Sequence, residues 1–533
     1  MTSKTIWLIA VINKEDENTA FLGVNEYLGI GYIKEVLCKN GYDARIQIAQ
    51  YDNDYDFRQT ISEMPMIIGF NMYSDTYNQV FHLAAQAKMV YPKAYVIIGG
   101  PQVNGYEVEI LNDHPEVDFI ISYEGEYTFL ALADRLRENK SLENCEGLTF
   151  RSVNGQIVKN KPRKAIENLD ALPFPSREIH EKYRQQYLYI SGSRGCNGGC
   201  IFCGETMARK NAPNVRLRSA KSIVDEIEFL YKKYNMTSFR MTDSTFEDPG
   251  ERGFKRANEI FDEIISRRLD IGLHLFSRAD LVVSEPDAYF NKAYEAGVEC
   301  FYIGIESGDS GDLHLYKKKS NTDINMQAIN KIRAANIHLG MGFICFNPFS
   351  TYESLRNNNN FMHESGLGHN FYLLQTRLEV LPQAPIRKKL IEQGLMIGDA
   401  GYCTHFYDYH FSDPLVEKFY HIIKRAYTEQ PVYYMDTILG MNRVWIKRCL
   451  TEEKRLKFDD MYAKFDSLCQ EYAEKNFRFF SQCLDLCFHK ASDEQIDNLI
   501  REYNLNELYQ LYLAQYNKIN IRVTKERVMY HLK

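Results

Sequence analysis

Short apolar runs alternate with amphipathic stretches of helical periodicity along most of this chain, and this alternation limits the fold more than any other feature. Five such runs come first, at residues 6–12, 44–49, 66–70, 94–98 and 119–121. Parallel strands need a crossover of about a dozen residues or more between them, and this crossover is usually a helix. We therefore expect residues 1–140 to form a Rossmann-like doubly wound parallel sheet, an α/β architecture.

A second series of apolar runs begins near residue 187. Its members are residues 187–191, 238–242, 272–276, 300–305, 339–346 and 372–381. Six strands with helices between them predict a partial or closed β/α barrel over residues 186–400. Residues 141–185 are expected to form a hairpin and a linker between these two units. Asn154-Gly155 favours a type I′ hairpin turn, and Leu172-Pro173-Phe174-Pro175 favours a stiff connector.

The last part of the chain, residues 401–533, has the periodicity of helices and few strand signals. We expect a mostly helical C-terminal domain, with helices near residues 416–428, 451–476, 479–489, 493–503 and 507–516. An aromatic-rich stretch at residues 402–411 has two interpretations. It either lines a substrate cavity or packs as a connector between domains.

Composition excludes two classes of partner. The formal net charge is −7, and the densest basic block is only Lys317-Lys318-Lys319, so a surface that follows nucleic-acid phosphates is not expected. No run of eighteen apolar residues occurs and no signal peptide is evident, which argues against a membrane span. We expect a cytoplasmic protein.

Three of the twelve cysteines lie within eight residues, as Cys196-x3-Cys200-x2-Cys203. Three thiolates this close, in a glycine-rich loop after a strand, can ligate three corners of an iron–sulfur cubane. A zinc site would favour two Cys pairs or an adjacent His, and neither occurs here. Three ligands leave one iron open for a small molecule. The alternative is a chance grouping of free thiols.

This spacing, with the aromatic Phe202 before the third Cys, resembles the signature of the radical S-adenosylmethionine (SAM) superfamily. The resemblance implies a 4Fe-4S cluster on Cys196, Cys200 and Cys203, whose open iron chelates the amino and carboxylate groups of SAM. It also implies reductive cleavage of SAM to a 5′-deoxyadenosyl radical, with Phe202 packed against the adenine. An electron donor such as flavodoxin or ferredoxin would be a partner.

Four further positions resemble the segments that contact SAM in this family. Asp243 ends the second barrel strand, Arg278 follows the third, and Glu306 ends the fourth. The resemblance implies that Arg278 meets the SAM carboxylate, that Glu306 reaches the ribose or amine, and that Gly342 of the fifth strand contacts adenine. Taken singly, Arg278 or Glu306 could instead be a capped loop end or a surface ion pair.

Two segments depart from the family pattern. The fifth strand continues into Asn347-Pro348-Phe349, and the sixth ends in Leu381-Pro382-Gln383-Ala384-Pro385. Neither matches the usual glycine- and proline-containing turns. These departures put the contacts on the substrate side in doubt, but they do not affect the cluster.

The N-terminal unit resembles the cobalamin-binding subclass of the same family. Gly99-Gly100 and Glu124-Gly125 fall at strand ends, where open α/β sheets bind cofactors. Without side chains, Gly99 and Gly100 let the backbone approach a large planar ligand. The resemblance therefore implies a cobalamin site at this edge.

No Asp-x-His-x-x-Gly motif, which supplies a cobalt-ligating His in other cobalamin proteins, occurs in this chain. The lower face of a bound cobalamin would then be open, or covered by a residue near Asn71, Met72 or Tyr73, after the third strand. The alternative is a domain retained as a scaffold that binds no cobalamin.

A second pair of cysteines, Cys483 and Cys487, lies one helical turn apart and precedes His489. It could mark another metal site. A helix that buries two thiols on its apolar face explains the spacing better.

The resemblance implies an enzyme that modifies an unactivated carbon of a small-molecule or peptide substrate, most often by methyl transfer. A radical rearrangement, cyclisation or peptide modification without methyl transfer is the first alternative. A sensor that binds a corrinoid or nucleotide without turnover is the second, but a sensor has no need of an open iron.

Overall fold

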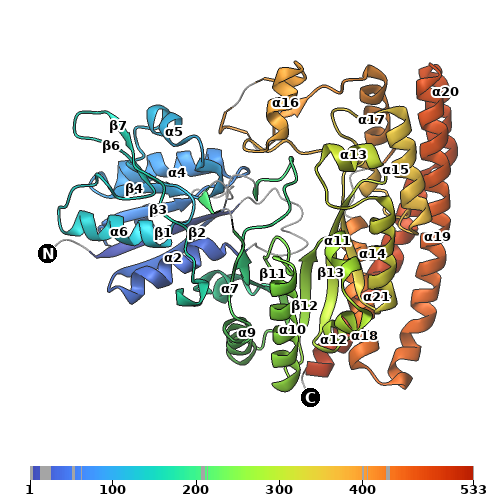
Figure 1. Cartoon of the computed structure of the whole chain (residues 1–533), viewed down its shortest axis with the longest axis horizontal. Helices are drawn as coiled ribbons and strands as arrows, with labels where there is room; N and C mark the ends of the chain where they lie inside the picture. The colour runs from blue at the N-terminus through green and yellow to red at the C-terminus, as the bar shows by residue number, and fades with distance from the viewer. Residues whose placement is uncertain are drawn as a thin grey trace.

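The computed structural model describes residues 4–12, 26–50, 55–61, 63–205, 211–212, 214–398, 401–404, 406–427 and 432–531. The N-terminal part is a seven-stranded sheet in the order β2-β1-β3-β4-β5-β6-β7 (Figure 1). The first five strands are parallel, which confirms the expected doubly wound sheet. The strands are β1 (Thr5–Ile12), β2 (Asp43–Gln50), β3 (Ile67–Asn71), β4 (Tyr95–Gly99), β5 (Phe119–Ile121), β6 (Leu148–Arg151) and β7 (Ile157–Lys159).

Helices cover both faces of this sheet. Alternate residues of β1 enter two separate cores, Trp7 in one and Leu8 in the other, which explains why β1 is a continuous apolar run. Helices α2 and α6 pack on one face, and α4 and α5 cover the other. The helices are α2 (Leu28–Lys39), α3 (Phe57–Thr60), α4 (Tyr77–Val90), α5 (Glu107–Asp113) and α6 (Glu126–Arg137), with a 3-10 turn at Pro101–Val103.

The expected hairpin is β6–β7, and it extends the N-terminal sheet by two antiparallel strands. Its turn is not type I′, because only Gly155 and not Asn154 has a positive φ, of 78°. Ser152 accepts a hydrogen bond from the Gly155 amide at 2.9 Å, and its own amide donates to Gln156 at 2.8 Å. This is a longer turn with glycine in the left-handed position.

The second unit is a five-stranded parallel sheet in the order β14-β13-β12-β11-β8, flanked by helices. It confirms a partial β/α barrel. Its elements are β8 (Leu188–Ile190), β9 (Ser193–Arg194), β10 (Arg216–Leu217), α9 (Ala220–Tyr234), β11 (Ser238–Met241), α10 (Glu251–Ser266), β12 (Gly272–Ser277), α11 (Ala279–Ser284), α12 (Asp287–Glu295), β13 (Val298–Glu306), α13 (Ser310–Leu315), α14 (Thr322–Ala334), β14 (His338–Phe343) and α15 (Tyr352–Glu364).

The prediction of a sixth strand at residues 372–381 is wrong. These residues form a 3-10 turn at Leu373–Gln375 and two isolated bridges, Phe346 to Arg377 and Val380 to Tyr407. The adjacent leucines Leu373 and Leu374 are both buried, which a turn allows and a half-exposed strand does not. Beyond them lie α16 (Ile386–Glu392), β15 (Met396–Ile397) and β16 (Asp408–Tyr409).

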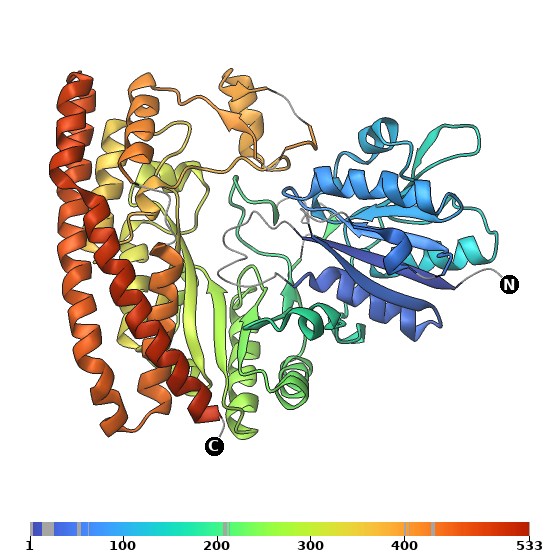
Figure 2. The same cartoon turned by 180° about the vertical axis from the view of Figure 1, so that it is seen from behind.

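The C-terminal part is helical, and long helices stand beside the barrel (Figure 2). Two predicted helices, at residues 451–476 and 479–489, are one continuous helix, α19. Helix α18 was missed from the sequence. The C-terminal helices are α17 (Pro414–Ala426), α18 (Val432–Cys449), α19 (Glu452–Phe488), α20 (Asp493–Tyr503) and α21 (Leu505–His531).

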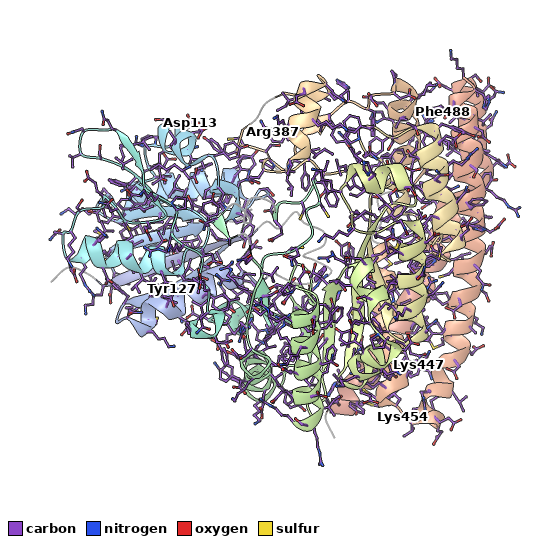
Figure 3. All side chains as sticks on the ribbon, viewed as in Figure 1. Asp113, Tyr127, Arg387, Lys447, Lys454 and Phe488 are labelled. Atoms are coloured by element: carbon purple, nitrogen blue, oxygen red, sulfur yellow. The ribbon has the colours of Figure 1, made fainter. Side chains whose placement is uncertain are left out.

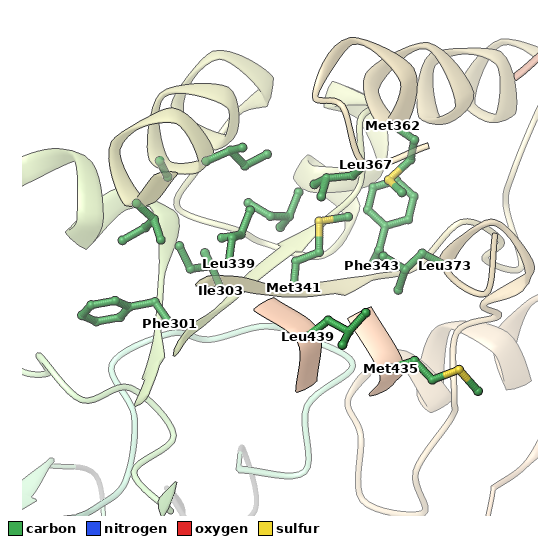
Figure 4. Close-up of a cluster of buried hydrophobic side chains, with 14 of the residues drawn as sticks. Phe301, Ile303, Leu339, Met341, Phe343, Met362, Leu367, Leu373, Met435 and Leu439 are labelled. Carbon is green, nitrogen blue, oxygen red and sulfur yellow. The ribbon is translucent and has the colours of Figure 1, made fainter. Parts of the chain in front are cut away.

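Helix α18 packs against β13 and β14. Figure 4 shows Leu339 and Met341 of β14 on one side of the strand and Leu439 of α18 on the other. On α19, Cys483 and Cys487 are both buried, as the apolar-face interpretation of their spacing predicted. No helix in the described part of the chain combines the length and apolar composition needed to cross a bilayer.

A buried ion network joins the N-terminal unit, the linker and the barrel. Arg177, just before α7 (Glu178–Tyr183), pairs with Glu26 and with Glu226, the latter at 2.7 Å. Arg218 also pairs with Glu226, at 2.6 Å. All four side chains are at most 5% exposed, so removing any one would leave an unpaired buried charge. This network fixes how the two units meet.

Tyr402 makes a second connection between the units. It is buried in the core of the N-terminal sheet, and its hydroxyl donates to Asp113, labelled in Figure 3, at 2.6 Å. Gln102 donates to the backbone oxygens of Tyr402 and Thr404. The start of the aromatic-rich stretch therefore packs as a connector. Its His405 lies outside the described residues.

Candidate functional site

The cysteine loop between β9 and β10 forms one wall of a cavity of about 180 Å³ at the carboxyl ends of the barrel strands. We call it the cluster cavity. Its lining residues are Cys196, Gly198, Gly199, Cys200, Phe202, Cys203, Glu205, Ser244, Thr245, Phe276, Ser277, Arg278, Tyr302, Gly304, Glu306 and Lys318. The structure thus brings the three cysteines together with Phe202, Arg278 and Glu306.

The loop that carries the cysteines is folded by its glycines and by one carboxylate. Gly195 and Gly199 have φ of 95° and 128°, which favours residues without a Cβ. The Asn197 amide donates to Asp248 at 2.7 Å, and the Gly198 amide donates to the Cys196 sulfur at 3.2 Å. Amide donors of this kind stabilise a thiolate.

The cysteine set fits an iron–sulfur cluster. Burial raises the pKa of Cys200, and raises that of Cys203 to about 11, so a metal would have to displace the thiol protons. Among the described residues, no three His, Cys, Asp or Glu side chains are close enough to share one metal ion. A cubane does not require that closeness, because each of its three thiolates ligates a different iron.

Arg278 lines the cluster cavity, but its guanidinium is already hydrogen-bonded to two carboxylates. Its Nη1 donates to both oxygens of Asp248, at 2.9 and 3.0 Å. Its Nε and Nη2 each donate to Asp280 at 3.0 Å. Although burial opposes the charge, these carboxylates raise the pKa of Arg278 above its ordinary value. Arg278 therefore also holds Asp248, which holds the cysteine loop.

Lys318 is a second cation in the cluster cavity, and sequence reasoning missed it. Its Nζ lies 3.3 Å from Glu306 Oε1, and its side chain is 6% exposed. Glu306 ends β13 with a φ of 67°. Gly342 lies opposite, where a Cβ would be 3.3 Å from Glu306 Oε2 and from the Tyr302 hydroxyl. The only sequence signal for Lys318 was its place in the three-lysine block.

Of two other residues predicted from the sequence, Phe202 and Asp243, only the first lines the cluster cavity. Phe202 lines the cavity and packs edge-to-face on Tyr316, with ring centroids 5.4 Å apart. Asp243 does not line it. The carboxylate of Asp243 is buried, accepts from the Gly192 amide at 2.8 Å and pairs with Arg256 at 3.2 Å. It thus anchors the chain just before the cysteine loop.

A larger cavity, of about 530 Å³, lies between the carboxyl edge of the N-terminal sheet and the barrel. We call it the sheet-edge cavity. Five residues that the sequence analysis assigned to a cobalamin site line it: Asn71, Gly99, Gly100, Glu124 and Gly125. Met72 is buried and is not among its lining residues.

The sheet-edge cavity fits a large planar ligand such as a corrin. Gly69, Gly99 and Gly125 leave its floor without side chains, and Tyr27 stacks on Tyr73 at 4.9 Å in its wall. Asn71 Oδ1 accepts from the Val11 amide at 3.0 Å, whereas its buried Nδ2 has no partner among the described residues. None of the described lining residues is His.

Glu124 both lines this cavity and joins the two units. Its carboxylate lies 3.3 Å from Arg194 and 2.8 Å from Arg216, both of the β9–β10 hairpin, and it accepts from the Ile166 amide. Burial alone would raise its pKa, but these partners hold the pKa of Glu124 below its ordinary value. Glu126 pairs with Arg194 at 2.5 Å.

Glu205 and Ser244 line both cavities and thus form a shared wall between them. Burial raises the pKa of Glu205, and a hydrogen bond from Ser244 partly offsets this shift. Sequence reasoning did not single out either residue, although Glu205 follows Cys203 by only two positions. Their placement means that the two cavities meet.

Comparisons with known proteins match each unit separately. Residues 19–133 match the model of the B12 binding domain, and residues 190–361 match that of the Radical SAM superfamily. A Pyrococcus horikoshii protein described as an uncharacterized methyltransferase is 26% identical over 336 residues, which is 62% of this chain and 71% of that protein. An anaerobic magnesium-protoporphyrin IX monomethyl ester cyclase of Synechocystis sp. is 28% identical over 279 residues, which is 51% of this chain and 54% of the cyclase.

One solved structure resembles this chain over nearly its whole length. It is the cobalamin-dependent SAM radical enzyme OxsB with aqua-cobalamin and SAM bound, at a TM-score of 0.74 and 19% identity. The match covers 98% of this chain and 83% of OxsB, and at this identity it shows a shared fold. By the Radical SAM match, the cofactors of the barrel are a 4Fe-4S cluster and SAM. By the B12-binding match, the cofactor of the N-terminal unit is cobalamin. The chain is a cobalamin-binding-domain-containing member of the radical SAM enzyme family.

Proposed function

We propose that this enzyme transfers a methyl group to an unactivated carbon of a small-molecule or peptide substrate. When bound, the cluster and SAM supply a radical that removes a hydrogen atom from carbon, and cobalamin supplies the methyl group. The observation that carries the proposal is the shared wall of Glu205 and Ser244. A substrate carbon next to these side chains lies within reach of both cavities, and methyl transfer needs that geometry.

The residues of the cluster cavity divide into two groups under this proposal. Cys196, Cys200 and Cys203 ligate the cluster. Lys318 and Glu306 form a charged pair at 3.3 Å, and each matches one end of an amino-acid zwitterion. We assign the carboxylate of SAM to Lys318 and its amino group to Glu306.

The remaining cavity residues bind apolar and planar parts of the cofactors. Phe202 lines the space proposed for adenine, and Gly342, which does not line the cavity, lies beside Glu306 and Tyr302. In the sheet-edge cavity, Gly99 and Gly125 admit the corrin, and Asn71 Nδ2 offers an amide donor that has no partner among the described residues.

Radical cyclisation without methyl transfer is the second candidate. It is favoured by one finding, the similarity to a protein named a cyclase. Both candidates need SAM cleavage and a reductant such as flavodoxin or ferredoxin. They differ in whether the methyl group of SAM leaves with the product.

The test uses SAM that carries a deuterium-labelled methyl group. Anaerobic, fully reconstituted enzyme is incubated with a reductant and a small-molecule extract. Methyl transfer predicts both 5′-deoxyadenosine and S-adenosylhomocysteine, together with one extract compound that gains the label. The protein with Cys196, Cys200 and Cys203 all changed to Ala serves as the control. 5′-Deoxyadenosine and a new product, with no label transferred, would favour cyclisation or rearrangement.

A further inference from the structure

A third cavity, of about 670 Å³, is lined by residues of α14, α15, α18 and α19 and shares no lining residue with the two cofactor cavities. Figure 1 shows where these helices lie. The cavity begins at His338, the first residue of β14, whereas Gly342 near the cluster cavity lies about 13 Å further along the strand. Its volume is within the usual range for ligand pockets, about 300–1,000 Å³. No step of the proposed reaction uses it.

Two cations of this cavity have no carboxylate partner among the described residues. Arg333 donates to the backbone oxygen of Ser365 at 2.5 Å, and Lys447 donates to Asn336 Oδ1 at 2.9 Å. Both acceptors are neutral. Lys447, labelled in Figure 3, extends from α18. Neither cation therefore has a carboxylate within salt-bridge distance among the described residues, although Asp436 near Arg333 and Asp459 and Asp466 near Lys447 partly compensate their charges.

The acids that line the cavity are already paired with other residues that line it. The carboxylate of Asp436 lies 3.2 Å from His369 Nε2, and the carboxylate of Asp466 lies 2.6 Å from Arg443 Nη2. Burial lowers the pKa of Arg333, and burial together with the nearby Arg443 lowers that of Lys447. A bound anion would relieve both effects.

Two histidines among the lining residues also have buried ring nitrogens without a partner among the described residues. The His338 ring packs against Gly440 of α18, where a Cβ would lie 1.9 Å from its Nδ1. Its Nε2 is buried without a partner among the described residues, as is Nδ1 of His363. Buried polar atoms of this kind are normally satisfied by protein, water or ligand.

Other lining residues are apolar and aromatic, among them Leu439 and Val444 of α18 and Tyr462 and Phe465 of α19. The Tyr462 hydroxyl donates to the Leu439 backbone oxygen at 3.0 Å, and the guanidinium of Arg443 lies over the Tyr462 ring, 4.4 Å from its centroid. A pocket lined by both cations and aromatic side chains matches a ligand that has an anionic head and an apolar body.

We propose that this cavity binds a small organic phosphate, with its head group on Arg333 and Lys447 and its apolar part against Tyr462 and Phe465. The site is separate from the cofactor cavities and does not depend on the reaction that they catalyse. Phosphate pairs with guanidinium and ammonium groups through strong charge-assisted hydrogen bonds.

The test titrates phenyl phosphate and inorganic phosphate into the reconstituted enzyme by calorimetry at low ionic strength. Phenyl phosphate should bind at least about tenfold more tightly than inorganic phosphate, because its ring is buried. The Arg333→Gln/Lys447→Gln variant should bind phenyl phosphate at least about tenfold more weakly than the native enzyme. The matched control is Arg356→Gln/Lys464→Gln, which removes two exposed cations from α15 and α19 and should bind like the native enzyme.

Iron and cobalt contents should be equal in all three proteins, which separates loss of this site from loss of the fold. Absence of saturable binding to the native enzyme would overturn the proposal. Equal affinity in the native enzyme and the Arg333→Gln/Lys447→Gln variant would also overturn it. Equal binding of the two probes to the native enzyme would contradict the organic ligand.

Discussion

Asp248 and Arg278 form a two-point contact at the edge of the cluster cavity, with Arg278 Nη1 2.9 and 3.0 Å from the two carboxylate oxygens of Asp248. The same carboxylate accepts from the Asn197 amide inside the cysteine loop. The end of β12 is thereby tied to the loop that carries the cysteines. Because Asp248 and Asp280 occupy the guanidinium of Arg278, the freer cation for SAM is Lys318.

Lys318→Gln should weaken SAM binding about tenfold and leave the iron content unchanged, because it removes a charge-assisted hydrogen bond but no loop contact. The measurement is the equilibrium dissociation constant of SAM on anaerobic protein with known iron content. Lys319→Gln is the matched control, since the Lys319 side chain is exposed and does not line the cavity. If Lys318→Gln bound SAM with native affinity, the SAM carboxylate would have to be assigned to Arg278 instead.

Asp248→Asn should lower iron loading, because the loop loses a charged acceptor whose hydrogen bond contributes about 1.5–3 kcal/mol. Iron and sulfide analysis after anaerobic reconstitution measures this effect. Asp280→Asn frees the other side of Arg278 without touching the loop, so it should retain its iron. Equal iron in both variants would show that Asp248 does not hold the loop.

Gly99→Leu should block cobalamin uptake while the cluster still forms. A Cβ at Gly99 would meet only Ile121, at 3.5 Å, so the added side chain has room to enter the sheet-edge cavity. Gly99→Ala is small enough to serve as the control at the same position. Cobalt content after incubation with hydroxocobalamin is the measurement, and full cobalt in Gly99→Leu would place the corrin elsewhere.

Gly100 is a poorer position for this test. A Cβ there would lie 2.5 Å from the Met72 backbone oxygen, and its φ of 119° favours glycine. A substitution at Gly100 would therefore distort the chain between β4 and β5, and loss of cobalamin would not be specific.

Glu247→Gln should make the stability of the protein less dependent on pH. The Glu247 carboxyl is fully buried, and burial raises its pKa from 4.5 to about 7, although Ser277 and Tyr289 donate hydrogen bonds to it. Between these values the unfolded chain has released the proton and the folded chain still holds it. Stability therefore falls as the pH rises through this window, by about 3 kcal/mol in total.

Urea unfolding of the protein at several pH values between 5 and 8 measures this dependence. The native protein should lose stability over that range, and Glu247→Gln should show a flatter profile and greater stability near pH 8. Parallel profiles for the two proteins would mean that Glu247 is already ionised in the fold.

Strand β1 was predictable because both of its faces are covered, so that its sequence is a continuous apolar run. Helix α18 was not. Its buried residues, among them Met435, Leu439 and Trp445, contact both the barrel and α21, so they form no single apolar stripe. The prediction of a sixth strand failed for a related reason. An apolar run alone does not distinguish a strand from a buried turn.

The cysteines and the strand-end glycines were predictable because their function needs a local spacing. Lys318, Glu205 and Asp248 were not, since each reaches the cluster cavity or its loop only through the fold. Asp243 shows the reverse case. It stands at the expected strand end, but its carboxylate turns into a buried pair with Arg256 instead of the cavity.

We propose that one protein holds an iron–sulfur cluster on Cys196, Cys200 and Cys203 and cobalamin at the edge of the N-terminal sheet. The most direct measurement is the iron and cobalt content of the native enzyme and of the variant with all three cysteines changed to Ala, both reconstituted anaerobically. The native enzyme should hold about four irons per chain and take up cobalamin, and the variant should lose the iron but keep the cobalt. Full iron in the variant, or no cobalt in a native enzyme that is loaded with iron, would contradict the claim.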